Sequence, residues 1–593
     1  MSVEHLITEN IDIWTSAIKT KSASQRGSSN KLELYGIKKL RELILQMAYS
    51  GKLFNDSLEE DFDSVLSDFK KQKESFHKIK GVRIQAFKRL HDEYKLPGLP
   101  SNWKECFLDE VITYITDFQA NGSFSTLKSN VKYYDTKNYA LLVRLTDLRH
   151  GLTNDSNYKY TDEHGYNFLN KSSVHGGELV IANVGAGVGT TLLVPELNMP
   201  ATLAPNMFMV VLPETIDKDY FLYFSQSPQY WAYLNSVNTG TGQPKINKTE
   251  YKNCKFPLAP LEVQKNIVSK IKELMALCDQ LESQTEASIE AHQTLVKTLL
   301  ETLTNAKDAD ELDESWQRIS EHFDVLFTTE DSIDQLKQTI LQLAVMGKLV
   351  KQDPSDEPVL SLFDRIEVAR NERICKKEIQ KPKKVTVSDE LEADFPDAWK
   401  TSLLNDLVFV TKLAGFEYTK YFDLKDKGEI PVIRAQNVRP FKPSKENLKY
   451  LDKQTSEMLP RSALDRPSLL VTFIGAGIGD VCIFNETTRW HLAPNVAKVE
   501  PFADVNLDFL CIYLNSPLGR NQLFKSMKST AQPSLSMTTI REIWVPIPPV
   551  EEQQRIVVKV DELMSLCDTL KIRLKDANGT QLHLTDAIVE QVS

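Results

Sequence analysis

The chain contains one long stretch twice, and this duplication limits the possible folds more than any other feature. A proline-bounded segment that begins at Pro257 returns at Pro546, a step of 289 residues, and the match runs on to Leu281 and Leu570. Proline is tolerated before a helix but not inside one, so a long helix is predicted after each proline pair. The apolar residues that follow recur at alternating steps of four and three, the seam of a coiled coil: Ile267, Ile271, Leu274, Cys278 and Leu281, then Ile556, Val560, Leu563, Cys567, Leu570 and Leu574. Because each helix follows a separate globular segment, we expect the two helices to pair and to hold two modules apart.

The repeat extends well beyond these helices. A helical segment that ends at Gly51 returns as one that ends at Gly347, and Trp103 returns as Trp399, both at a step of 296. Within the modules, strand-like runs match at steps of 290 and 289, including 141–148 with 431–438 and 179–189 with 469–479. The intervening residues 120–138 and 151–171 have no evident counterpart in the second half. A shared scaffold with divergent inserts is typical of two related readers of different targets.

Composition limits the class of protein. A chain of 593 residues is too long for one core. It has no run of eighteen apolar residues and no signal-peptide pattern, and its seven cysteines form no C-x-x-C pair, so we expect a cytoplasmic protein with no membrane partner. The net charge of −10 argues against a coat of basic residues but leaves room for local nucleic-acid contacts. Two charged stretches, about 57–95 and 352–392, are predicted to be solvated helices or linkers.

Motifs for catalysis are missing from the sequence. The glycine runs 185–189 and 475–479 resemble nucleotide loops, but strand-like residues follow each one where a helix is required. We therefore predict tight turns between strands, whose N–H groups are able to face a DNA phosphate. The sequence contains no phosphate loop, no Asn/Asp-Pro-Pro-aromatic tetrapeptide of an amino-methyltransferase and no histidine spacing typical of a metal site. No catalytic residue, metal ligand or cofactor is predicted.

Polar residues near the ends of the repeated strands are the candidates for binding. The forked side chains of Arg, Gln and Asn match the edges of guanine and adenine in the major groove, although an ordinary surface strand explains any single residue equally well. The candidate DNA-binding residues are Arg144, Thr146, Asp147, Asn183, Gln243 and Lys245 in the first half, and Arg434, Gln436, Asn437, Thr472 and Gln532 in the second. The candidate phosphate contacts are Lys128, Lys132, Lys137, Lys245 and Lys248, with Lys442, Lys445, Lys525 and Lys528.

In combination, these features resemble the DNA specificity (S) subunit of a type I restriction-modification enzyme. The resemblance rests on the helix 340–350 and the segment 352–358 after it, on the two tryptophans, on the paired glycine turns and on the Pro-x-x-Pro-x-x-x-Gln leads into the long helices. It covers essentially the whole chain. It implies that two recognition domains each read half of a bipartite site in double-stranded DNA. It also implies that the long helices pair antiparallel, set the spacer and dock two modification subunits, with restriction subunits as further partners. S-adenosylmethionine, ATP and catalysis would belong to those partners.

The expected fold is α+β and internally duplicated, with two mixed α/β target-recognition domains separated by long antiparallel coiled-coil helices and extra helical segments at the N-terminus and centre. The expected domains are 1–99 (N-terminal helices), 100–260 (recognition domain 1), 261–305 (spacer helix 1), 306–395 (central helices), 396–549 (recognition domain 2) and 550–593 (spacer helix 2). The extra helices are assigned to partner docking. Two alternatives stay open: a coiled-coil scaffold that binds only protein, and a stand-alone DNA-modifying enzyme.

Overall fold

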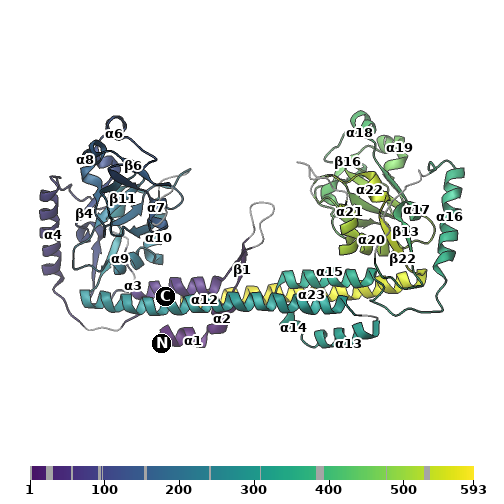
Figure 1. Ribbon diagram of the computed structural model, residues 1–593, viewed down its shortest axis with the longest axis horizontal. Helices are drawn as coiled ribbons and strands as arrows, with labels where there is room; N and C mark the ends of the chain where they lie inside the picture. Colours follow the sequence, from purple (N-terminus) through teal and green to yellow (C-terminus); the bar gives the residue numbers. More distant parts are fainter. Residues whose placement is uncertain are drawn as a thin grey trace. The chain divides into compact units, whose positions relative to one another are not determined.

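The computed structural model describes residues 3–21, 31–54, 58–90, 95–96, 98–152, 157–238, 242–306, 309–381, 391, 393–475, 477–525 and 534–592. Its contacts divide the chain into two compact units, which are drawn in Figure 1. Unit 1 comprises Met1–Ala287 and Asn578–Ser593, and unit 2 comprises Ser288–Ala577. Each unit therefore contains one globular module and a segment of each of the two repeated long helices. We call residues 100–260 module 1 and residues 396–549 module 2.

Unit 1 begins with short helices, a strand pair and two longer helices: α1 (Val3–Glu9), α2 (Ile11–Ser16), β1 (Lys19–Lys21), β2 (Lys31–Glu33), α3 (Tyr35–Tyr49) and α4 (Phe62–Ile79). Module 1 follows, with β3 (Lys104–Phe107), α5 (Leu108–Val111), β4 (Tyr114–Asp117), η1 (Phe118–Asn121), α6 (Phe124–Asn130), β5 (Ala140–Val143), α7 (Leu145–Arg149), β6 (Lys159–Thr161), α8 (Glu163–Phe168), η3 (Asn170–Ser172), β7 (Ser173–Val174), β8 (Leu179–Ala182), β9 (Thr191–Leu193), β10 (Ala201–Leu203), β11 (Met207–Val211), α9 (Lys218–Phe224), α10 (Pro228–Val237), α11 (Lys248–Lys252) and β12 (Lys255–Leu258).

Unit 2 begins with α13 (Ala309–Ser320), α14 (Phe323–Leu326), α15 (Glu330–Val345) and α16 (Val359–Cys375). Module 2 has β13 (Lys400–Leu403), α17 (Leu404–Leu407), β14 (Val408–Lys412), α18 (Gly415–Tyr421), β15 (Ile430–Ile433), η4 (Ala435–Asn437), β16 (Lys449–Leu451), α19 (Lys453–Met458), η5 (Pro460–Ser462), β17 (Ala463–Leu464), β18 (Ser468–Thr472), β19 (Val481–Phe484), β20 (Trp490–Leu492), β21 (Val496–Pro501), α20 (Leu507–Asn515), α21 (Pro517–Phe524), α22 (Met537–Arg541) and β22 (Trp544–Ile547). The long helices are α12 (Leu261–Thr304) and α23 (Val550–Val592).

The two modules have the same sheet topology. Module 1 contains one sheet of order β6-β5-β10-β7 and another of order β4-β11-β8-β9, and module 2 repeats them as β16-β15-β20-β17 and β14-β21-β18-β19. In both copies the central pair of the first sheet is parallel, β5 with β10 and β15 with β20, whereas the remaining pairs are antiparallel. A two-stranded ladder, β3 with β12 and β13 with β22, closes each module. The predicted duplicated α+β fold is confirmed.

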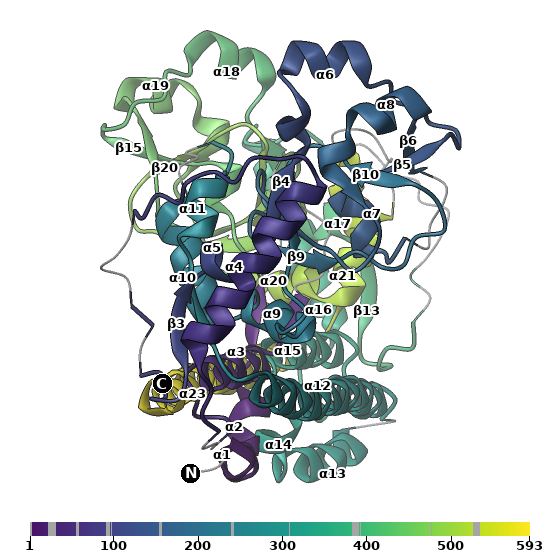
Figure 2. The same cartoon turned by 90° about the vertical axis from the view of Figure 1, so that its left-hand side faces the viewer.

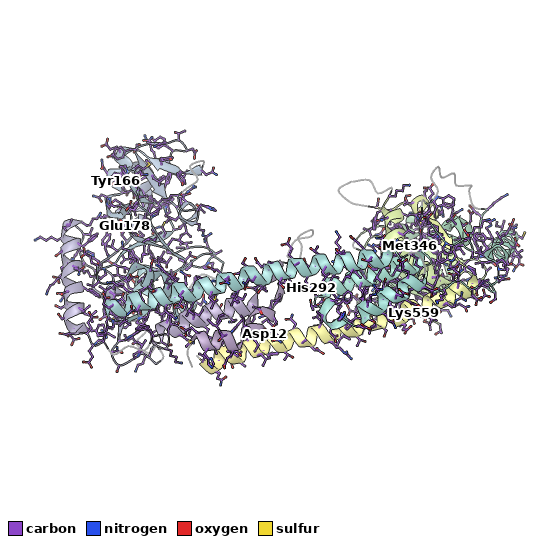
Figure 3. All side chains as sticks on the ribbon, turned by 60° about the horizontal axis from the view of Figure 1, so that its bottom comes forward. Asp12, Tyr166, Glu178, His292, Met346 and Lys559 are labelled. Atoms are coloured by element: carbon purple, nitrogen blue, oxygen red, sulfur yellow. The ribbon has the colours of Figure 1, made fainter. Side chains whose placement is uncertain are left out.

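Each unit buries segments of both long helices in its core. In unit 1, Leu274 and Cys278 of α12 share an apolar cluster with Ile588 of α23 and with Trp14 of α2. In unit 2, Leu300 of α12 belongs to one cluster with residues of α15 and α23. The first part of α12 thus shares a unit with the last part of α23, and the reverse holds in the other unit, which is the order of an antiparallel pair. The N-terminal and central helices contribute to these cores, and His292 of α12, labelled in Figure 3, lies 2.8 Å from the carbonyl oxygen of Leu326.

The charged stretches form helices that pack on the modules, so the prediction of purely solvated segments was incomplete. Helix α4 buries Phe69 within the core of module 1, and Lys73 forms an ion pair with Asp109 of α5 at 3.1 Å. Helix α16 occupies the equivalent place on module 2, where Arg370 lies 3.4 Å from Asp406 of α17. Both pairs follow a step of 297 residues. The charged face is therefore shared between solvent and module, which is a tertiary feature that charge composition does not reveal.

Candidate nucleic-acid interface

The strand-end arginine of module 1 is held inside its own module. Arg144 follows β5, and its guanidinium donates to both carboxylate oxygens of Asp147, Nε to Oδ2 at 2.9 Å and Nη2 to Oδ1 at 2.7 Å. Nη2 also donates to the carbonyl oxygen of Asn157 at 2.5 Å. The hydrogen bond to Asp147 raises the pKa of Arg144. Because bidentate pairs of this kind are strong and geometrically specific, the pair fixes the turn after β5. It also occupies Nε and Nη2 of the Arg144 guanidinium.

Module 2 repeats this arrangement with a neutral partner. Arg434 follows β15, its backbone N–H donates to Asn437 Oδ1 at 3.2 Å, and its Nη2 donates to the carbonyl oxygen of Asn447 at 2.5 Å. The amide of Asn437 in turn donates to the carbonyl oxygens of Ser444 and Glu446 at 3.1 and 2.8 Å. In both modules, the residues after this strand organise a loop through their polar side chains. Asp147 and Asn437 are buried, so these four positions do not form the ordinary surface strand that was the alternative to DNA binding.

The candidate DNA-binding residues also differ in exposure. Asp147, Asn437 and Thr472 are buried, and Asn183 is half-buried. The exposed candidates are Thr146, Gln436, Gln243 and Lys245. Gln532 and Lys528 lie outside the described residues. The exposed lysines are Lys128, Lys132, Lys137, Lys442, Lys445 and Lys525; Lys445 pairs with Glu486 at 2.8 Å, and the half-buried Lys248 pairs with Asp117 at 3.0 Å.

The glycine runs are turns between antiparallel strands, as predicted. Residues 185–189 connect β8 to β9, and residues 475–479 connect β18 to β19 at the equivalent place. Gly185 and Gly475 have φ angles of 100° and 102°, in a region that side chains other than glycine rarely adopt. An isolated bridge joins Val184 to Lys245 in module 1, and its counterpart in module 2 joins Ile474 to Ser534. The turn therefore meets Lys245 at one edge of module 1 and Ser534 at the equivalent edge of module 2.

Two arginines that the sequence analysis did not select lie beside these turns. A Cβ atom built on Gly187 would lie 2.7 Å from Nη2 of Arg149, and one built on Gly477 would lie 3.8 Å from Nη1 of Arg439. Both arginines are exposed, and they occupy equivalent positions at a step of 290 residues. In module 1, a Cβ atom on Gly185 would lie 4.0 Å from Nε2 of Gln243. A signal for these arginines was present in the sequence, because both follow the matched runs 141–148 and 431–438 by one residue.

The exposed polar groups at this edge favour binding over catalysis. Module 1 presents Arg149, Gln243 and Lys245 around the glycine turn, and module 2 presents Arg439 beside its own turn. These side chains combine forked donors with point charges, the two elements of base and phosphate recognition. Within the part of the chain that the structure describes, no group of three or more His, Cys, Asp or Glu side chains is placed to hold a metal ion. No helix among the described residues is long and apolar enough to span a membrane.

A family model and two relatives agree on one family. The family model described as "Type I restriction modification DNA specificity domain" matches residues 100–291 and 396–577. The specificity subunit of the type I restriction enzyme EcoEI from Escherichia coli is 32% identical over 616 residues, covering 100% of this chain and 99% of the relative. That of EcoAI, also from Escherichia coli, is 33% identical over 612 residues with the same coverage. A solved chain from work on assembly and conformational transition of the type I R-M system is 14% identical, with a TM-score of 0.45 over 84% of this chain and 98% of that chain.

Proposed function

Because this chain belongs to the family of type I restriction-modification DNA specificity subunits, we propose that modules 1 and 2 each read one half of a bipartite site in double-stranded DNA. The chain is the non-catalytic specificity subunit of a multisubunit methyltransferase and endonuclease. Chemistry on DNA therefore belongs to its partners, two modification subunits and the restriction subunits. With family membership, the stand-alone enzyme and the protein-only scaffold lose their support.

One observation supports the division into two readers more than any other. The modules share strand order, the buried polar turn after β5 and β15, and the glycine turn with its neighbouring arginine, but the exposed residues around that turn differ. Thr146 stands where module 2 has Gln436, and Lys245 stands where it has Ser534. A fixed scaffold gives both modules the same approach to the groove, whereas different side chains select different bases. One chain with two related modules presents the pseudo-twofold symmetry of a dimer to two unlike half-sites.

We assign DNA reading to residues 100–260 and 396–549, spacing to 261–305 and 550–593, and docking of partner subunits to 1–99 and 306–395. The α12 and α23 helices support the spacing role, since a helix of fixed rise per residue is a natural length standard. We place the protein in the cytoplasm, where the DNA is and where the thiols of Cys278 and Cys567, both buried on these helices, stay reduced.

The test is methylome sequencing of cells that express this chain with its methyltransferase partner, with and without this gene. A bipartite methylated motif that disappears without the gene supports the proposal. Replacing residues 100–260 by the corresponding module of a relative should then change one half of the motif and leave the other half. A change in both halves would contradict the assignment of one half-site to each module.

The spacing role has its own test. Insertion of whole helical turns after Leu281 should lengthen the unspecified spacer between the half-sites while both half-site sequences stay the same. The control is an insertion of the same length next to Gly98, where a Cβ atom would meet no other atom within 4 Å. A spacer that stays constant in the first variant, with methylation intact, would contradict the role of the long helices as a ruler.

A further inference from the structure

A basic pocket lies in unit 1, where α4 and the residues after it meet module 1. It encloses about 470 Å³ between α4, the segment 82–88, β4 and α11. Figure 2 shows α4 running along module 1 beside β4. Six of the lining side chains are cationic, and none of the described residues that line the pocket is acidic: Lys73, Arg83, Lys88, Lys171, Lys248 and Lys252. The volume lies within the range of ligand sites, and the lining is mainly cationic.

The carboxylates around the pocket do not balance its positive charge. Asp109 pairs with Lys73 at 3.1 Å and with Lys252 at 2.7 Å, and Asp117 pairs with Lys248 at 3.0 Å. These two carboxylates thus pair with three ammonium groups. A fourth, that of Lys171, donates to the carbonyl oxygen of Ala120 at 3.3 Å. Burial lowers the pKa of Lys73 more than its pair with Asp109 raises it, and Lys252 adds to the lowering against a small opposing effect of Glu110. An anion in the pocket would relieve this repulsion.

A buried hydroxyl without a protein partner also lines the pocket. Thr113 is 6% exposed, and its Oγ1 meets no hydrogen-bond partner among the described residues. Thr116, two positions into β4 beyond Tyr114, is 2% exposed and lines the same pocket. A buried polar atom is normally paired, so a donor left open beside cationic side chains fits an acceptor oxygen supplied by a ligand. Ile112 and Phe87 contribute apolar wall, which strengthens charged contacts by excluding water.

Module 2 shows that the scaffold does not require Thr113 or Lys248. Tyr114 pairs with Val211 in module 1 as Phe409 pairs with Glu500 in module 2, so Thr113 and Thr116 correspond to Val408 and Thr411. The first residue of α11, Lys248, corresponds to Met537 at the start of α22. The duplicated fold thus forms with apolar residues in place of Thr113 and Lys248, whereas the threonine at Thr116 is kept. This polar pair in module 1 is therefore a property of that module and not a condition of folding.

We propose that this pocket is a phosphate-binding site, which takes the phosphate group of a small phosphorylated ligand or of a DNA strand. The cationic side chains supply charge, and the Thr113 hydroxyl supplies a directed hydrogen bond from the buried end of the site. The inference does not depend on base reading at the glycine turns, which lie elsewhere in the module.

The first arm of the test uses the full chain without DNA. Inorganic phosphate at millimolar concentration should raise the thermal unfolding midpoint of unit 1 above the value in chloride of equal ionic strength, because a ligand that binds only the folded state stabilises it. The variant Thr113→Val, Lys248→Met carries the residues of module 2 at both positions and should lose this rise. Lys171→Gln, a single change, should reduce it. Lys265→Gln, at an exposed site on α12, removes the same charge and should keep it.

The second arm distinguishes the source of the phosphate. If the site receives a DNA phosphate, free phosphate leaves the midpoint unchanged, while the double variant binds a duplex carrying the methylated motif with a salt-dependence slope smaller by about one. The recognised motif should stay the same in that variant. No phosphate effect together with an unchanged slope overturns the proposal. A phosphate effect in a chain that directs no methylation would refute the proposed function and leave this site standing.

Discussion

Gln264 accepts a hydrogen bond from the backbone N–H of Asp217 at 2.9 Å, and its amide donates to the carbonyl oxygen of Ala259 at 2.8 Å. This side chain, 1% exposed, ties the start of α12 to module 1. The repeated glutamine of α23, Gln553, makes the same two contacts with Asn506 and Pro548, at 3.1 and 2.9 Å. The glutamine of the Pro-x-x-Pro-x-x-x-Gln lead is therefore the joint between a module and its long helix.

Replacing Gln264 with Leu should destabilise unit 1 by about 1–3 kcal/mol, because the N–H of Asp217 and the carbonyl of Ala259 lose their partner in a buried place. Urea unfolding followed by hydrogen exchange in module 1 measures this loss. Lys265→Ala, the next residue on the same helix and exposed, should change the free energy of unfolding by less than about 0.5 kcal/mol. Equal losses in the two variants would show that the joint contributes no stability.

A glycine closes each of the repeated helices α3 and α15 and also contacts the start of the module. Gly347 has a φ of 71°, and a Cβ atom on it would lie 2.5 Å from Cγ of Pro396. Gly347→Ala should therefore destabilise unit 2 by about 1–3 kcal/mol, through backbone strain and the displaced proline. Gly579, inside α23, has no atom within 4 Å of its missing Cβ, so Gly579→Ala should stabilise the helix by up to about 1 kcal/mol. Calorimetric unfolding of both variants distinguishes these opposite signs.

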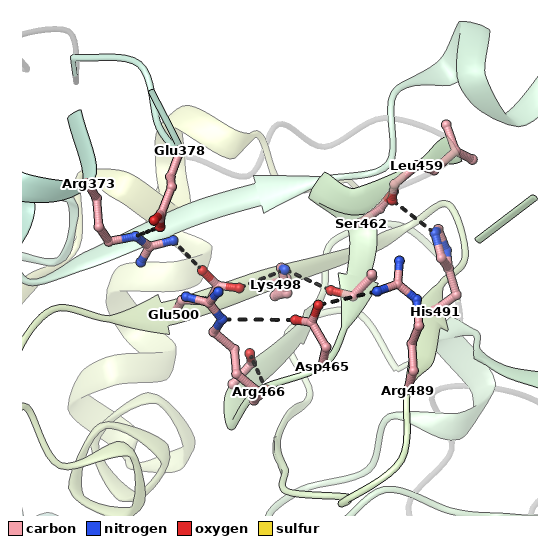
Figure 4. Close-up of polar contacts among 12 residues, drawn as sticks. Arg373, Glu378, Leu459, Ser462, Asp465, Arg466, Arg489, His491, Lys498 and Glu500 are labelled. Atoms are coloured by element: carbon pink, nitrogen blue, oxygen red, sulfur yellow. Dashed lines mark hydrogen bonds and ion pairs between the residues drawn. The ribbon is translucent and has the colours of Figure 1, made fainter. Parts of the chain in front are cut away.

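Module 2 contains a buried ion network where module 1 is apolar. Lys498 and Glu500 of β21 lie 2.7 Å apart and are each 4% exposed at the side chain, and Arg373 of α16 reaches Glu500 at 2.7 Å (Figure 4). Burial alone would raise the pKa of Glu500, but Lys498 and Arg373 outweigh it and hold the pKa below its usual value. The group therefore contributes stability above pH 4.5, and this contribution is lost as the pH falls through its lower folded value.

Removing one partner of this network should cost far more than removing both. Glu500→Ala leaves Lys498 buried without its carboxylate and should destabilise unit 2 by about 3–5 kcal/mol. The pair Lys498→Met, Glu500→Val introduces the residues that module 1 carries at Met209 and Val211 and should be far less destabilising than Glu500→Ala. Chemical unfolding of both variants measures the difference. If the double variant were the less stable of the two, the network would be a requirement of the module 2 core.

A second buried group in module 2 predicts a pH dependence at milder acidity. His491 on β20 is fully buried, with Nε2 3.3 Å from the carbonyl oxygen of Leu459, and burial lowers its pKa, aided by Arg489 and Lys498. The folded state thus binds fewer protons than the unfolded one, so stability should fall as the pH drops below about 6.5. Hydrogen exchange of β20 amides between neutral pH and pH 5 should show this loss, and His491→Gln should flatten it. An equal slope in both proteins would assign the titration to another group.

The periodicity and spacing of the repeat were sufficient to predict the duplicated fold, because proline leads, helix-closing glycines and the apolar seam are local signals. The binding edge was predicted only in part. Arg144 and Asp147 were interpreted as strand-end residues available to DNA, but Asp147 is buried and pairs with Arg144, whose guanidinium also donates to the carbonyl of Asn157, thirteen residues later. Such burial depends on loop contacts that no local pattern specifies. Arg149 was missed for the converse reason, since its place beside Gly187 arises from tertiary structure.

The exposed arginines at the glycine turns provide the sharpest test of where DNA is read. Arg149→Ala should weaken binding to duplexes with the intact first half-site by about tenfold to a hundredfold, the loss of one bidentate base contact, and should relax methylation at one position of that half. Arg439→Ala should do the same in the other half. Because both side chains are exposed, the thermal midpoint should stay within the range of ordinary surface substitutions.

The contrast with the half-buried Arg144 makes this prediction decisive. Arg144→Ala removes the partner of Asp147, so it should lower the thermal midpoint of unit 1 before it alters which bases are read. Methylation sequencing and thermal unfolding of the three single variants separate the two roles. Relaxed specificity in Arg144→Ala with an unchanged midpoint, and no effect in Arg149→Ala, would move the reading residues back to the strand end. A uniform loss of affinity in Arg149→Ala with an unchanged motif would make Arg149 a phosphate contact, since phosphate contacts position the protein without specifying bases.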